Sequence, residues 1–204
     1  MSGLDASSAL CGAVGIEEPP GWRDYFELAK TWGARTDLTS ARTDEELSEI
    51  LFLDAAFVIK ARWCASRATL VDIGAGVGAP TLPILLSDDG LTGVLVEPRR
   101  IRTTFLRTAA GSLGIASRVT ALEQKIDPRE PSVQGAPFSI ALSRATFAPE
   151  EWLPIGAQLA EEVWVLTAGT EPECPDDLQL VRRIDYAVPS SGAPRSVLAY
   201  RRAL

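Results

Sequence analysis

The sequence predicts an α/β fold: a mostly parallel sheet with helices on both faces, a helical cap before it and a terminal antiparallel hairpin after it. Three observations support this prediction. Before residue 68, apolar residues recur at helical spacing. From residue 69 onward, short apolar runs alternate with helix-like segments, which is the pattern of βαβ units. The last two apolar runs are separated only by a short loop rich in proline, serine and glycine, which is typical of a hairpin.

Length and composition set the expected organisation. The chain has 204 residues, 46% hydrophobic and 23% charged, which fits one globular domain with an extension. We expect a disordered leader at residues 1–17, because these residues are small and weakly apolar and lack the basic start of a signal peptide. The helical cap then covers residues 18–67 and the sheet domain residues 68–204. No apolar run reaches the roughly 18 residues of a membrane span, so we expect no membrane contact and a cytoplasmic location.

Two helices make up the predicted cap. The first covers residues 19–33, opens on a proline pair and places its apolar residues three and four positions apart. Those residues are Trp22, Tyr25, Phe26, Ala29 and Trp32. The second begins at Thr43, which forms a capping box with Glu46, and runs to about Trp63.

The sheet domain follows in order along the chain. The predicted strands are 69–73, 92–96, 117–122, 138–142 and 162–167, and the helices between them are 80–87, 98–113 and 149–160. The hairpin pairs 178–188 with 195–201. Because helices separate the first five strands, these strands are expected to be parallel, with their carboxyl ends at one edge of the sheet.

The first strand ends in a glycine-rich loop that predicts a cofactor site. Gly74, Gly76 and Gly78 alternate after the strand, and Pro80 suits the start of the following helix. The stretch Gly74-x-Gly76-x-x-Ala79 also fits the dinucleotide fingerprint, which is a weak signal by itself. A glycine-rich turn without a ligand is the structural alternative.

Two acids indicate which cofactor binds. Asp72 lies two residues before the first glycine, as in the first motif of S-adenosyl-L-methionine (AdoMet)-dependent methyltransferases, and the dinucleotide fingerprint does not require it. Glu97 ends the second strand, where a carboxylate can accept hydrogen bonds from both ribose hydroxyls. Glu97 suits AdoMet and NAD equally, so Asp72 favours AdoMet. With the strand order, this predicts a Rossmann-like, class I AdoMet-dependent methyltransferase fold.

Composition excludes several kinds of chemistry. The chain contains no histidine, which rules out histidine general bases, histidine metal ligands and Ser-His-Asp triads. Its cysteines, Cys11, Cys64 and Cys174, lie far apart without a C-x-x-C motif, so we expect no metal and a reducing compartment. The net charge of −7 argues against nonspecific coating of nucleic acid, although Arg99, Arg100, Arg102 and Arg107 make one basic stretch.

Several motifs together resemble the RsmG (GidB) family, which methylates N7 of a guanine in 16S, small-subunit ribosomal RNA. The matching stretches are Asp37-Leu38-Thr39, the glycine loop with Pro80 and Pro83, Glu97 with the basic stretch after it, and Ser143-Arg144-Ala145. The family's Arg-x-Glu after the third strand corresponds to Lys125-Ile126-Asp127. The resemblance covers residues 32–204 and implies the family's fold, AdoMet and a ribosomal RNA or small ribosomal subunit as partner.

The chain departs from the family at four positions. Leu51 replaces a helix histidine, Asp37 replaces an asparagine, Ile101 replaces a lysine, and Thr167-Ala168 stands where a lysine is usual. These changes leave the AdoMet pocket intact. They keep two alternatives open: a methyltransferase for a small molecule or protein, and a non-catalytic module that binds AdoMet.

The resemblance and the strand ends together give a set of candidate site residues. Asp72 is expected to order the glycine loop or to meet the methionine amine, while Gly74, Gly76, Gly78 and Ala79 line the cofactor. Glu97 is expected to hold the ribose, and Ile126 and Asp127 to flank the adenine, although Asp127-Pro128 is also a common turn pair.

Arg144 is the candidate catalytic residue and is also one of the candidate cofactor-binding residues. It follows the fourth strand, and its planar guanidinium suits a carboxylate, a phosphate or guanine O6. Asp54 lies on an otherwise apolar helix and needs a partner, for which Arg42 and Arg144 are candidates. Methyl transfer to guanine N7 uses a lone pair without a proton, so a chain lacking histidine can support it.

Overall fold

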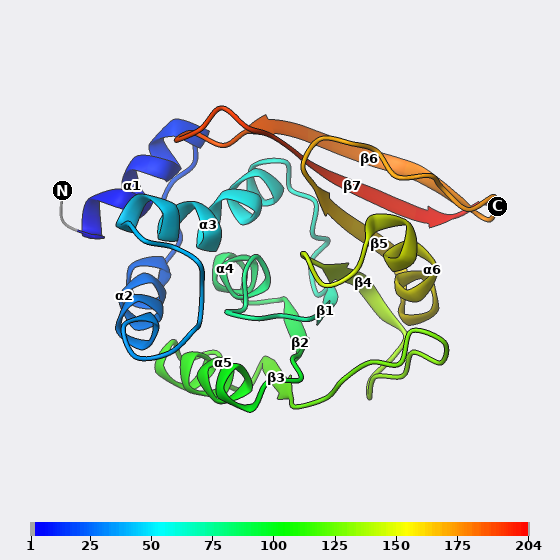
Figure 1. Cartoon of the computed structure of the whole chain (residues 1–204), viewed down its shortest axis with the longest axis horizontal. Helices are drawn as coiled ribbons and strands as arrows, with labels where there is room; N and C mark the ends of the chain where they lie inside the picture. Colours follow the sequence, from blue (N-terminus) through cyan, green and yellow to red (C-terminus); the bar gives the residue numbers. More distant parts are fainter. Residues whose placement is uncertain (1–2, 204) are drawn as a thin grey trace.

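The structure, a computed structural model, describes the backbone of residues 3–203 and contains one seven-stranded sheet (Figure 1). The helices are α1 Gly3–Val14, α2 Trp22–Gly33, α3 Asp44–Lys60, α4 Thr81–Ser87, α5 Arg100–Ser112 and α6 Pro149–Leu159. The strands are β1 Thr69–Ile73, β2 Thr92–Val96, β3 Val119–Leu122, β4 Phe138–Ser143, β5 Ala160–Thr167, β6 Leu178–Ala187 and β7 Pro194–Arg202. Each predicted strand, and each helix predicted from residue 19 onward, is therefore present, with small shifts at the ends.

The strand order is β3-β2-β1-β4-β5-β7-β6. Strands β1 to β5 are parallel, and β7 pairs antiparallel with both β5 and β6, so the predicted terminal hairpin is confirmed. The order reverses beside β1, which lies between β2 and β4, and this is the point where open α/β sheets bind ligands.

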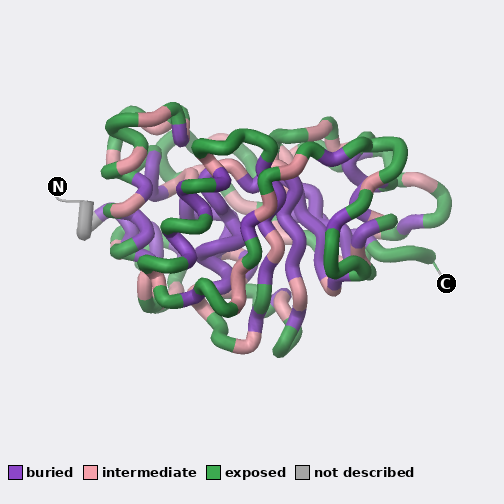
Figure 2. Tube along the Cα trace, turned by 90° about the horizontal axis from the view of Figure 1, so that it is seen from below, coloured by how far each residue is buried: buried purple, intermediate pink, exposed green. Residues whose placement is uncertain are grey.

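Side chains of successive strand residues enter two different cores, because a strand points them alternately to opposite faces. Leu70 and Leu95 pack with the cap helices, α4 and α5 on one face. Val71 and Val163 pack with α6 on the other face. The buried strands run through the middle of the molecule with exposed loops around them (Figure 2).

The cap shares its core with the sheet domain. Trp22 of α2 stacks on Phe52 of α3 with ring centroids 4.4 Å apart, and its indole N–H donates to the carbonyl oxygen of Pro83 in α4, at 3.1 Å. Thr43 caps α3 by accepting a hydrogen bond from the Glu46 N–H, as the capping box predicts. The boundaries at residues 18–67 and 68–204 remain predictions.

The predicted disordered leader is wrong for residues 3–14, which form α1, while residues 1–2 lie outside the described residues. Residues spaced three and four apart on α1 are buried, namely Ser7, Leu10, Cys11 and Val14. Two side chains of α3 fasten the helix: Ser48 donates to the carbonyl of Ala6 at 3.1 Å, and Lys60 donates to that of Val14 at 2.6 Å. Alanine, glycine and serine occur on all sides of α1, so its sequence shows no narrow apolar stripe that would predict a helix.

Candidate active site

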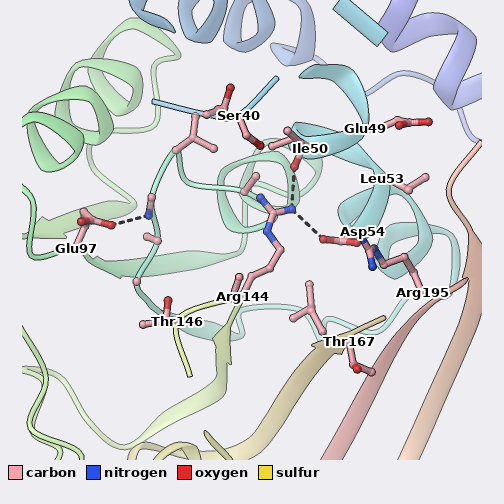
Figure 3. A pocket seen from close by; sticks show the side chains of 18 of the residues that line it. Ser40, Glu49, Ile50, Leu53, Asp54, Glu97, Arg144, Thr146, Thr167 and Arg195 are labelled. Atoms are coloured by element: carbon pink, nitrogen blue, oxygen red, sulfur yellow. Dashed lines mark hydrogen bonds and ion pairs between the residues drawn. The ribbon is translucent and has the colours of Figure 1, made fainter. Parts of the chain in front are cut away.

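A cavity of about 920 Å³ opens at the carboxyl ends of the parallel strands (Figure 3). Its floor is the glycine loop with Glu97 and the residues that follow β4. The loop before α3 and the inner side of α3 form one wall, and the hairpin contributes Tyr186, Val188 and Arg195. The volume is within the range of small-molecule sites.

The glycine loop needs glycine for two distinct reasons. Gly74, Gly76 and Gly78 have φ of 77°, 57° and 91°, a left-handed backbone that other residues rarely adopt. A Cβ on Gly78 would lie 2.6 Å from Leu82, and one on Gly74 would lie 1.9 Å from the Thr146 hydroxyl. A Cβ on Gly76 would meet nothing closer than 3.8 Å, so the backbone here is open to a ligand.

The structure divides the predicted loop residues between lining and support. Gly74, Gly76 and Ala79 line the cavity, as predicted for cofactor contacts. Gly78 is absent from the lining and packs on Leu82 and Leu106 instead.

Asp72 lies beneath the loop and does not line the cavity. It is 1% exposed, and the hydroxyl of Thr81 donates to its Oδ2 at 2.6 Å. Burial raises the pKa of Asp72 to about 7, although the Thr81 hydrogen bond and Arg144 act in the opposite direction. Asp72 therefore ties β1 to the first residue of α4, which fits the loop-ordering role predicted for it.

Glu97 holds the glycine loop against the end of β2. Its Oε2 accepts from the N–H of Gly76 at 3.0 Å, and its Oε1 accepts from the N–H of Arg99 at 2.8 Å. The residue is 3% exposed and lines the cavity. A carboxylate oxygen can accept more than one hydrogen bond, so both oxygens of Glu97 can still accept from ribose hydroxyls.

Arg144 joins β4 to α3. Its Nη1 donates to the carbonyl of Ile50 at 2.8 Å and to Oδ2 of Asp54 at 3.0 Å (Figure 3). Arg144 is thus the partner that Asp54 was expected to need. Oδ1 of Asp54 also accepts from the Tyr186 hydroxyl at 2.5 Å, so one carboxylate connects β4, α3 and the hairpin. Burial, followed by Asp54, raises the pKa of Tyr186, so this phenol stays a neutral donor.

The structure does not bring Ile126 and Asp127 to the cavity. Ile126 is buried in the core beneath α6, and Asp127 is exposed with its Oδ1 accepting from the N–H of Arg129 at 2.9 Å. Asp127 therefore forms the turn that was its alternative interpretation. Their adenine-flanking role remains a prediction.

Comparison with known proteins decides the family. The family model described as rRNA small subunit methyltransferase G (GidB) matches residues 21–171. A ribosomal RNA small subunit methyltransferase G from Myxococcus xanthus is 30% identical over 96% of this chain and 95% of its own length. One from Anaeromyxobacter dehalogenans (strain 2CP-1) is 26% identical over 87% of this chain and 85% of its own length.

The chain belongs to the rRNA small subunit methyltransferase G family. It is an AdoMet-dependent methyltransferase, so AdoMet, not NAD, is the cofactor. Among solved structures, an AdoMet-dependent methyltransferase from Thiobacillus denitrificans, in complex with S-adenosyl-L-homocysteine, has a TM-score of 0.59 and 10% identity. That match covers 87% of this chain and 98% of that one. At this identity the likeness supports the class I fold alone.

The residues that line the cavity lie partly inside and partly outside the stretch that matches the family model. The glycine loop, Glu97 and Arg144 lie within the matched residues 21–171, whereas Tyr186, Val188 and Arg195 of the hairpin lie outside them. Sequence reasoning missed these hairpin residues, along with Thr146 and Glu49. Thr146 could have been found from its place beside Ser143-Arg144-Ala145, but an alternating hairpin does not reveal which face meets the site.

Within residues 3–203, none of the helices has the length and apolar character needed to span a bilayer. The same residues contain no cluster of three or more potential metal ligands.

Proposed function

We propose that this protein transfers the methyl group of AdoMet to N7 of a guanine in small-subunit ribosomal RNA. Its relatives are named as methyltransferases of that RNA, and the departures at Leu51, Asp37, Ile101 and 167–168 leave the cofactor loop intact. A cytoplasmic location, where ribosomal subunits are found, belongs to the same proposal.

One observation carries the proposal: the cavity combines a nucleoside-type floor with four arginines. Glu97 and the glycine loop lie on one side, and Arg99, Arg102, Arg144 and Arg195 surround them. Three carboxylates, Glu49, Asp54 and Glu97, also line the cavity, so its arginines outnumber its acids in a chain of net charge −7. Clustered guanidinium groups suit phosphate and guanine recognition better than a neutral small molecule.

The residues of the floor fit AdoMet. Gly76 offers open backbone, Glu97 offers carboxylate oxygens for the ribose, and Asp72 with Thr81 fixes the loop from below. When bound, AdoMet supplies an electrophilic methyl group on a sulfonium. Arg144, held by Asp54 and Ile50, presents its remaining N–H groups at the cavity, where guanine O6 can accept from them.

The acceptor chemistry matches what the chain provides. Guanine N7 attacks with a lone pair that carries no proton, so no side chain must act as a base. The protein contributes proximity and orientation, which can lower a barrier by about 7 kcal/mol or more. Tyr186 and Asp54 keep Arg144 oriented, and neither of them has to donate or accept a proton during methyl transfer.

The proposal is tested on small ribosomal subunits from a strain that lacks the gene. Wild-type protein with AdoMet is expected to produce 7-methylguanosine in the small-subunit RNA, detected by nucleoside mass spectrometry. The double variant Arg99→Glu/Arg100→Glu is expected to lose RNA methylation far more than AdoMet binding, since both residues are exposed beside the site.

Two outcomes would count against it, and a third would indicate a damaged variant. Absence of 7-methylguanosine with wild-type protein would favour a small-molecule or protein acceptor. Binding of AdoMet without turnover of any acceptor would favour the non-catalytic module. Equal loss of AdoMet binding and RNA methylation in the double variant would indicate damage to the fold, so a thermal melt of each variant is the control.

A further inference from the structure

We propose that Arg195, at the start of β7, binds a backbone phosphate of the acceptor RNA and so positions the target nucleotide over the cofactor. The inference rests on the proposed function, because it needs an RNA acceptor. Arg195 lines the cavity from the hairpin, lies outside the residues matched by the family model, and is one of four arginines there.

Among the described residues, three of the four arginines that line the cavity lack an anionic partner. In the part of the chain that the structure describes, no ion pair or side-chain hydrogen bond forms at the guanidinium of Arg99 or Arg195. Arg102 reaches only the carbonyl of Asp37, at 3.4 Å, and its buried Nε has no partner. AdoMet carries a single carboxylate, which one guanidinium can satisfy. The remaining guanidinium groups are therefore available to an anion of the acceptor.

The three arginines without an anionic partner among the described residues lie on two sides of the cavity. Arg99 and Arg102 follow β2, on the side of the glycine loop and Glu97, and Arg102 lies 3.9 Å from the Cβ position of Gly76. Arg195 lies across the cavity from Glu97 and next to Asp54 (Figure 3). It is also the cross-strand partner of Tyr186. Arg102, whose guanidinium lies beside Gly76, is therefore the candidate for the cofactor carboxylate, and Arg195 on the other side of the cavity is left for the acceptor.

The hairpin tip is fixed in place. Tyr186 and Arg195 are direct cross-strand partners in the β6–β7 register. Tyr186 donates to Asp54 at 2.5 Å and stacks on Phe57, with ring centroids 4.3 Å apart. An arginine beside such an anchored neighbour loses less freedom on binding than one on a mobile loop.

A second fastening lies at the turn of the hairpin. Glu49 of α3 accepts both the backbone N–H of Ser190, at 2.8 Å, and its hydroxyl, at 2.7 Å. The two contacts hold the tip against α3, as its course over the cap helices also indicates (Figure 1). These contacts explain how a hairpin at the edge of the sheet can place a binding residue beside a site that the parallel strands build.

The test compares Arg195→Gln with Arg202→Gln in the full chain. Arg202 lies on the same strand but away from the cavity, near Asp177 and the carbonyl of Ala157. Binding to small ribosomal subunits from the deletion strain is measured from about 50 to 200 mM KCl with saturating S-adenosylhomocysteine, and calorimetry gives the S-adenosylhomocysteine affinity separately. Arg195→Lys tests whether charge suffices.

We expect Arg195→Gln to weaken subunit binding about three- to tenfold and to reduce the slope of log K against log salt by about one. Arg195→Lys should keep the slope, and S-adenosylhomocysteine affinity should stay unchanged in every variant. Arg202→Gln should behave as wild type. A purely structural role would lower affinity without changing the salt slope.

Three results would overturn this inference alone: wild-type affinity and slope in Arg195→Gln, a lower affinity with an unchanged salt slope, or a loss of S-adenosylhomocysteine affinity equal to the loss of subunit binding. Failure of wild-type protein both to bind and to methylate subunits would overturn the proposed function, and this inference with it.

Discussion

At the residue scale, Glu97 performs two tasks with one carboxylate. It accepts the backbone N–H groups of Gly76 and Arg99, and it lines the cavity where a ribose is expected. The sequence motif suggested the second task only. The structure adds that the same side chain also shapes the loop.

Glu97→Ala should weaken S-adenosylhomocysteine binding by about 1–3 kcal/mol, because both ligand bonds and loop order are lost. Glu97→Gln, which keeps one oxygen acceptor, should lose less. Isothermal calorimetry measures both, and Glu161→Ala, an exposed acid on β5, is the matched control. Unchanged affinity in Glu97→Ala would remove this residue from the site.

Asp72 gives stability a predictable pH dependence. Its pKa rises from an ordinary 3.8 to about 7 in the folded protein, chiefly through burial. Between these values the folded state holds a proton that the unfolded chain has released, so Asp72 makes the free energy of unfolding fall as pH rises. The loss is complete above about pH 7.

Asp72→Asn should remove this dependence. The free energy of unfolding of wild type should fall between pH 5 and 7, whereas that of the variant should not. The difference, variant minus wild type, should therefore increase by up to about 1.4 kcal/mol per pH unit. Urea titrations at several pH values measure it, with the exposed Asp176→Asn as control. A difference independent of pH would mean that Asp72 titrates normally.

At the element scale, α2 supports the cofactor loop from outside the sheet. The Tyr25 hydroxyl donates to the carbonyl oxygen of Val77 at 2.6 Å, and both residues are buried. Burial raises the pKa of Tyr25, so the phenol stays protonated and remains a donor. The cap therefore helps to hold the loop shape that AdoMet requires.

Tyr25→Phe should lower stability by about 1–3 kcal/mol, since the Val77 carbonyl loses its buried partner. We expect S-adenosylhomocysteine affinity to fall several-fold as the loop loosens. Tyr200→Phe is the matched control: Tyr200 is fully buried on β7, and among the residues that the structure describes its hydroxyl has no hydrogen-bond partner to lose. Chemical denaturation and calorimetry should separate the two variants, and equal behaviour would refute a supporting role for α2.

At the scale of the whole molecule, the absence of histidine and the protonless acceptor atom predict a reaction that needs no general base. Single-turnover methylation at saturating AdoMet and subunits should be nearly flat from about pH 6 to 8, where an unperturbed histidine would titrate. Asp72 titrates in this window but lies beneath the loop, so saturation should hide its effect on binding.

Arg144→Ala should lower that plateau without adding a slope, because arginine stays charged throughout. Quench-flow measurement with mass spectrometry of the nucleosides checks both statements. A tenfold rise per pH unit would mean that a proton leaves the acceptor before transfer. The acceptor would then be an amine, hydroxyl or thiol in place of guanine N7.

The sequence alone determined the order of the sheet elements and the cofactor loop. Both depend on local signals: alternating apolar runs, glycines that permit positive φ, and acids placed at strand ends. Tertiary structure decided the rest. Arg144 pairs with Asp54 although the two are 90 residues apart in the sequence, and Tyr186 bonds to Asp54 from 132 residues away. Such pairings depend on how the cap and the hairpin pack. Helix α1 is held in place by α3. The hairpin turns Arg195 toward the cavity because α3 anchors its tip. No local sequence pattern encodes these contacts.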